Sequence, residues 1–130
     1  MSTDAINIKD AFIINIGLNF DVTIKSNYNN KLVLNNCLQE LLNYFNVDKW
    51  KINEPIILSE IYSILDAVDG VQTVKNVNIY NKNGEEQGYS KYGYDIKSAT
   101  INNIIYPSLD PSIFEIKFPQ NDIQGRSVSF

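Results

Sequence analysis

Few side chains of this chain belong to the types that usually perform chemistry. Asp66 and Asp69 stand three residues apart, a spacing at which two carboxylates on one helix can hold a cation or act as an acid and a base. The segment from Asn81 to Glu86 partly resembles a calcium loop, but the regular frame of such a loop is absent. We therefore expect two exposed surface carboxylates at the first place and a turn at the second.

The chain contains one cysteine, Cys37, and no histidine. The lack of histidine excludes Ser-His-Asp triads, Cys-His pairs and the common zinc sites from this chain. Cys37 falls on an apolar stripe between Val33 and Leu41, where a thiol is normally a small buried side chain with a raised pKa. The sequence therefore predicts no catalytic residue, no cofactor and no metal site.

Tyrosines are concentrated in residues 81–94, a segment that we expect to form a hairpin arm. Tyr89, Tyr92 and Tyr94 stand there among glycines and lysines. Tyrosine with interleaved lysine can stack single-stranded nucleic acid, but the nearby acidic residues cancel the potential that such a groove needs. Tyrosine is also favoured in protein contacts, because its ring gives a rigid surface at low entropic cost. These rings are therefore predicted either to contact another protein chain or to complete the core.

The elements that position these residues begin with a long strand from Phe12, since six apolar residues recur at every second position from Ile14 to Ile24. The face predicted to be buried comprises Ile14, Ile16, Leu18, Phe20, Val22 and Ile24. The face predicted to be solvated comprises Asn15, Asn19, Asp21, Thr23 and Lys25. Gly17 interrupts the polar face and is a candidate bulge.

Two amphipathic helices are predicted next. The first covers residues 31–45, with apolar residues every three or four positions and Asn29 or Asn30 as its N-cap. The second, shorter helix has Ser59 as its expected N-cap and ends near Gly70, which suits a left-handed conformation. The connector between the two helices contains Trp50, the only tryptophan.

The rest of the chain predicts further strands. Residues 71–80 alternate, and Asn83 with Gly84 is the dipeptide preferred in a type I′ hairpin turn. Residues 103–106 and 113–118 are predicted to form a final hairpin that Pro119 stops. Strand, two helices, strand and hairpin together predict an α+β fold, a two-layer structure whose largely antiparallel sheet carries both helices on one face.

Composition bounds the class of protein. The 130 residues suit one domain, 1–130, with an ordinary apolar content of 44%. A formal net charge of −4 at pH 7 argues against a nucleic-acid partner, and no apolar run approaches the length of a membrane span. We therefore expect a soluble domain that binds neither nucleic acid nor a membrane.

Two stretches resemble a known family. The residues from Glu54 to Ile61, followed by Ala67-Val68-Asp69-Gly70-Val71-Gln72-Thr73-Val74, are similar to the C-terminal domain of baseplate J-like proteins. The run from Ile105 to Pro119, followed by Asp122-Ile123-Gln124-Gly125-Arg126, resembles the end of the large baseplate wedge subunit of contractile-tailed myophages. The resemblance implies that this chain corresponds to the C-terminal domain of a longer virion protein in the tail baseplate. It also implies contacts with other wedge proteins and no catalysis.

The predicted function is therefore subunit contact within a phage baseplate wedge, with a homodimer as the expected form of the isolated chain. Two alternatives are a small-molecule-binding or peptide-binding module and a carboxylate-dependent enzyme. The candidate interface comprises the tyrosine segment and the C-terminal tail, residues 120–130, whose alternating end could add a strand to a neighbouring sheet. The candidate interface residues are Tyr89, Tyr92, Tyr94, Trp50, Val128 and Phe130.

Overall fold

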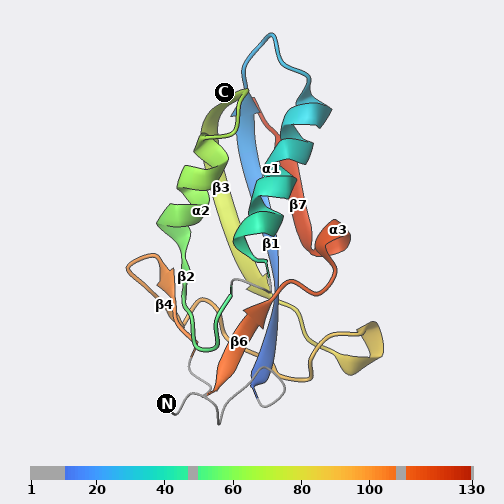
Figure 1. Cartoon of the computed structure of the whole chain (residues 1–130), viewed down its shortest axis with the longest axis vertical. Helices are drawn as coiled ribbons and strands as arrows, with labels where there is room; N and C mark the ends of the chain where they lie inside the picture. The colour runs from blue at the N-terminus through green and yellow to red at the C-terminus, as the bar shows by residue number, and fades with distance from the viewer. Residues whose placement is uncertain (1–10, 47–49, 108–110, 130) are drawn as a thin grey trace.

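The main sheet is built around one long strand, β1 (Phe12–Ile24), in a computed structural model that describes residues 11–46, 50–107 and 111–129 (Figure 1). On one side, β3 (Val71–Asn81) pairs with β1 in antiparallel orientation from Ile16 to Ile24. On the other side, β6 (Ser112–Glu115) and β7 (Ile123–Ser127) both run parallel to β1. β1 is therefore the central strand, with β3 along one edge and β6 and β7 one after the other along the other edge.

Two helices cover one face of this sheet (Figure 1), which confirms the predicted two-layer α+β fold. Helix α1 (Asn30–Tyr44) has Asn29 as its N-cap, whose side chain accepts a hydrogen bond from the Leu32 N–H. Helix α2 (Leu58–Asp66) begins without a side-chain cap, so the prediction of Ser59 as N-cap is wrong. No helix in the described ranges is long and apolar enough to cross a membrane.

The core lies between the helices and the predicted apolar face of β1. Alternate residues of β1 from Ile14 to Val22 are at most 2% exposed. They pack against Val33, Cys37 and Leu41 of α1 and Ile61 and Leu65 of α2, which are equally buried. The apolar face of the strand, which repeats every two residues, therefore packs against the apolar stripes of the helices, which repeat every three to four.

Burial makes Cys37 an unreactive thiol. Its side chain is fully buried, and burial raises the pKa of the thiol to about 11. We therefore expect a disulfide reagent such as DTNB to label Cys37 at least about tenfold more slowly in the folded chain than in urea at about pH 8, because thiolates are the reactive form. Labelling at the same rate in both conditions, followed at 412 nm, would contradict this burial.

The opposite face of β1 differs from the prediction at three positions. Asn15 and Thr23, predicted to be solvated, are only 1% and 2% exposed. Asn15 is covered because the chain returns across it at Ser90. Gly17 is not a bulge: it pairs with Tyr80, and the register shifts lie instead between Asp21 and Val22 and between Thr23 and Ile24.

The short elements replace the predicted final hairpin. Residues 104–105 form β5 (Ile104–Ile105), which joins β2 (Ile56–Ile57) and β4 (Thr100–Ile101) in a small antiparallel sheet. The predicted partner, residues 113–118, instead supplies β6 of the main sheet. A short helix, α3 (Pro119–Asp122), links β6 to β7. The hairpin prediction is wrong because β5 pairs with β2 and with its neighbour β4, whereas β6 pairs with the distant β1.

Candidate functional site

The tyrosine segment, residues 81–94, is a folded loop and not a hairpin arm. After β3 ends at Asn81, a 3-10 turn covers Glu85–Gln87, and no returning strand follows within the segment. A type I′ turn needs positive φ at both central residues; Gly84 has a φ of 122°, but Asn83 does not lie in the positive region. The loop closes through hydrogen bonds from Gly84 N–H to Ser90 C=O and from Tyr89 N–H to Gly84 C=O.

Two asparagine side chains attach this loop to the sheet. The Asn15 Oδ1 accepts a hydrogen bond from the Ser90 N–H at 2.7 Å, and its Nδ2 donates to Glu115 Oε1 at 2.9 Å. The Asn81 Oδ1 accepts from the Tyr94 N–H at 3.0 Å, and its Nδ2 donates to the Asn15 carbonyl. Carboxamides suit this role because each one both donates and accepts.

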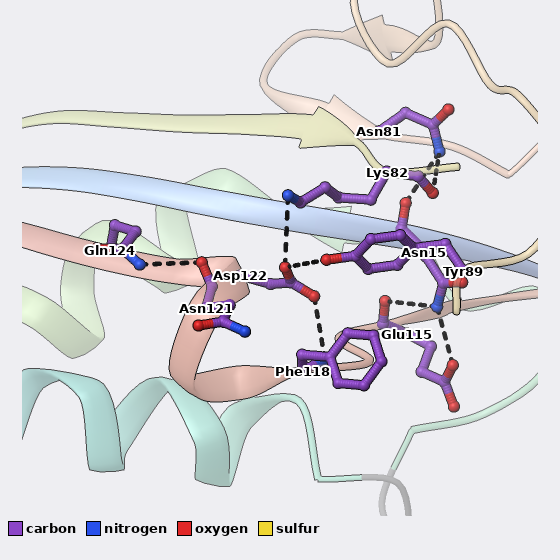
Figure 2. A network of polar contacts seen from close by, with 9 residues as sticks. All are labelled: Asn15, Asn81, Lys82, Tyr89, Glu115, Phe118, Asn121, Asp122 and Gln124. Carbon is purple, nitrogen blue, oxygen red and sulfur yellow. Dashed lines mark hydrogen bonds and ion pairs between the residues drawn. The ribbon is translucent and has the colours of Figure 1, made fainter. Parts of the chain in front are cut away.

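A buried carboxylate ties the loop to the C-terminal part of the chain. Figure 2 shows Lys82, Tyr89 and Phe118 converging on Asp122, which is 0% exposed. Tyr89 donates its hydroxyl proton to Asp122 Oδ1 at 2.7 Å, the Phe118 N–H donates to Oδ2 at 3.0 Å, and Lys82 Nζ lies 3.6 Å from Oδ1. The hydrogen bond to Asp122 raises the pKa of Tyr89. Each carboxylate oxygen thus has a partner within the domain, as a structural role requires.

All three predicted interface tyrosines also pack their rings on their own chain. Tyr89 lies edge-on to Phe118, with ring centroids 5.3 Å apart. Tyr92 contacts Phe12 in the same manner at 4.9 Å. Tyr94 packs on Phe114, and its hydroxyl donates to the Tyr106 carbonyl. Of the two predicted roles for these rings, the structure therefore shows contacts of the second kind, within the domain.

The C-terminal tail, predicted to extend a neighbouring sheet, extends its own. Residues 123–127 form β7 along β1, and the Val128 N–H donates to the Val22 carbonyl at 2.9 Å. The half-buried Val128 thus continues the intramolecular pairing. Phe130, the other tail residue predicted at an interface, lies outside the described residues.

The two aspartates predicted on one helix lie on different segments, since Asp66 is the last residue of α2 and Asp69 follows in the turn before β3. Asp66 and Asp69 are both exposed, and Asp69 accepts a hydrogen bond from the Tyr28 hydroxyl at 3.0 Å. This bond raises the pKa of Tyr28. Among the residues that the structure describes, no group of three or more His, Cys, Asp or Glu side chains is placed to hold a metal ion.

The remaining predicted residue, Trp50, lines a hollow of about 320 Å³. Leu42 of α1 and Phe45, the C-cap of that helix, border this hollow on one side, and Ile13 of β1 and Ile116, just after β6, also line it. We call it the Trp50 hollow. The Trp50 ring packs against Tyr44 and Phe45, each at 5.3 Å between ring centroids.

Trp50 also carries an unusual polar group. Its side chain is only 7% exposed, yet its indole Nε1–H has no hydrogen-bond partner within the described ranges. A buried indole N–H normally has an acceptor, and leaving it without one costs about 1–3 kcal/mol. This donor is itself shielded from solvent, so what the hollow offers to an occupant is its largely apolar wall.

Comparison with known proteins leaves this site to be interpreted from its own geometry. No protein-family model matches the chain, and no curated protein matches it.

Proposed function

We propose that this chain is an assembly domain of a contractile-tail baseplate wedge, and that it contacts a neighbouring subunit at the Trp50 hollow. The observation that carries this proposal is the largely apolar hollow that Trp50 lines together with Leu42 and Phe45. A protein segment suits this site, since an apolar side chain of a neighbouring subunit can fill the hollow and cover its apolar wall. The resemblance to baseplate wedge subunits supports the same function.

A second copy of the chain is the partner that can be tested directly. Trp50 is the only tryptophan, so its fluorescence reports on this site alone. We expect the purified chain to form a dimer that dissociates on dilution, and the emission of Trp50 to change over the same concentration range. Sedimentation velocity and fluorescence measured together up to about 1 mM cover even weak contacts.

Two substitutions make this test specific to the hollow. Ile116→Glu places a charge at its half-buried border and is expected to give a monomer at every concentration, because desolvating an unpaired charge is costly. Leu32→Ser, at a side chain on α1 that is 60% exposed, is the control and should still form the dimer. A native chain that stays monomeric with constant Trp50 emission, or a dimer that survives Ile116→Glu, would refute self-contact at the hollow.

The volume of the hollow also suits a small ligand, which keeps one alternative function open. A hollow of about 320 Å³ lies at the lower end of the range for small-molecule sites. The dye ANS distinguishes the two cases. If ANS changes the Trp50 emission of a chain that remains monomeric at all concentrations, a small-molecule-binding module is favoured over an assembly domain.

A further inference from the structure

The sheet face opposite the helices carries two rows of polar side chains that no single segment of sequence contains. Asn78, Asn19 and Gln124 form one row, because β3 and β7 pair with β1 at these positions. Asn76, Asp21 and Arg126 form the next row. We call these six residues the amide face. They border a shallow hollow of about 490 Å³.

The carboxamides in the middle of this face are available to a ligand. Asn19, Asn76 and Asn78 are exposed, and their side chains make no hydrogen bond within the part of the chain that the structure describes. Each therefore offers donors and an acceptor to solvent. Sheet geometry places such groups about 4.8 Å apart across strands and about 6.8 Å apart along a strand, on a rigid backbone. These spacings are comparable with the width of one sugar ring.

The charged pair on the face is already neutralised. Arg126 Nε donates to Asp21 Oδ1 at 2.8 Å, and Arg126 Nη2 lies 3.4 Å from Asp21 Oδ2. Arg126 is the only cation among the six residues, so the face lacks the clustered positive charge that phosphates require. It also lacks the buried apolar anchors that dominate contacts between proteins.

An aromatic ring adjoins the first row. Tyr80 pairs with Gly17, and a Cβ on Gly17 would lie 2.5 Å from the Tyr80 Cζ. The ring therefore occupies the space above β1 that a side chain at position 17 would fill. It is half-buried and lies two residues from Asn78 on the same strand face. Lys82 Nζ lies 5.8 Å from the centroid of this ring, and the part of the ring that Gly17 and Lys82 leave open can pack against the C–H groups of a sugar.

We propose that the amide face, with Tyr80 at its end, binds an uncharged carbohydrate chain. Carboxamides and sugar hydroxyls both donate and accept, so each can satisfy the other in pairs. The neutral ion pair suits a ligand without charge, and the ring of Tyr80 supplies the one apolar contact. This site lies on the face of the sheet opposite the core and does not depend on the function proposed for the Trp50 hollow.

The test is a titration of the ¹⁵N-labelled chain with three neutral tetrasaccharides, chitotetraose, cellotetraose and maltotetraose, followed by NMR. We expect at least one of them to shift the side-chain NH₂ signals of Asn19, Asn76 and Asn78 and to leave the Trp50 indole signal in place. The double variant Asn19→Ala/Asn78→Ala is expected to bind about tenfold more weakly, the effect of losing two hydrogen bonds. Asn35→Ala, at an exposed position of α1, should bind as the native chain does.

A second variant separates loss of the site from loss of the fold. Tyr80→Leu keeps an apolar side chain beside Gly17 but removes the ring, so it should weaken binding while the urea midpoint stays near that of the Asn35→Ala chain. The proposal is overturned if no tetrasaccharide shifts these signals at about 20 mM, if the double variant binds as well as the native chain, or if dextran sulfate shifts the same signals in their place. Self-association is measured through Trp50 and sedimentation, so a negative result with the tetrasaccharides does not change the outcome of that test.

Discussion

Phe20→Ala is expected to lower the free energy of unfolding by about 3–5 kcal/mol, the usual cost of truncating a buried phenylalanine. The Phe20 side chain is 2% exposed and lies at the centre of the apolar face of β1, beneath the helices. Its removal leaves a cavity between sheet and helices. Urea unfolding followed by circular dichroism measures the change, and Asn19→Ala, on the exposed face of the same strand, should change the free energy by less than about 0.5 kcal/mol.

The neighbour of Phe20 on β7 makes this prediction more specific. Gly125 pairs with Phe20, and a Cβ on Gly125 would lie 2.1 Å from the Phe20 Cζ. Gly125→Ala is therefore expected to cost about 1–3 kcal/mol in the native chain by overpacking. In the Phe20→Ala background the same substitution should cost almost nothing, because the ring is gone. Equal costs in both backgrounds would show that Gly125 does not accommodate the ring.

Asp122→Ala is the second substitution with a large expected effect, a loss of about 2–4 kcal/mol. It leaves the Tyr89 hydroxyl and the Phe118 N–H without the acceptor that the fully buried carboxylate of Asp122 supplies. Lys82 adds less, since its side chain is 31% exposed and can turn to solvent. The urea midpoint measures the total effect.

Two further variants separate the contributions at Asp122. Tyr89→Phe removes one of the hydrogen bonds and should cost about 1 kcal/mol. Asp66→Ala, at an exposed carboxylate of α2, should cost less than about 0.5 kcal/mol. If Asp122→Ala is as mild as Asp66→Ala, the buried network of Figure 2 does not hold the tyrosine segment to α3.

The spacing of apolar residues predicted the elements that bury one face, β1 and α1. The alternation in β1 and the stripe of α1 are set by which residues must avoid water, and this can be recognised within fifteen consecutive residues. The cap at Asn29 follows from local geometry in the same way. Gly70 has the expected positive φ, 98°, but α2 ends earlier, at Asp66 with Ala67 as its C-cap, so Gly70 does not end the helix.

Pairing between distant segments was not predictable in this way. The β7 sequence contains only one buried apolar residue, Ile123. Its glycine, Gly125, lies within the strand and leaves room for the Phe20 ring, whereas a glycine in a sequence normally suggests a turn. Asn15 was expected in solvent because the alternation of β1 assigns it to the polar face, whereas a loop 75 residues later covers it. Trp50 was identified by residue type alone, since its hollow forms only where α1 meets β1 and β6. The amide face likewise requires three strands to align.

The position of β7 in the sequence has a consequence for how the chain folds. The contact between Asp21 and Arg126 spans 105 residues, so the central strand has one unpaired edge during most of synthesis. Closing so long a loop is entropically costly, and contacts of this range slow the approach to the folded state. Until β7 arrives, the backbone N–H and C=O groups of β1 on that side are open to any other strand, including one from a second nascent chain. The strand that organises the finished domain is thus its most vulnerable part before completion.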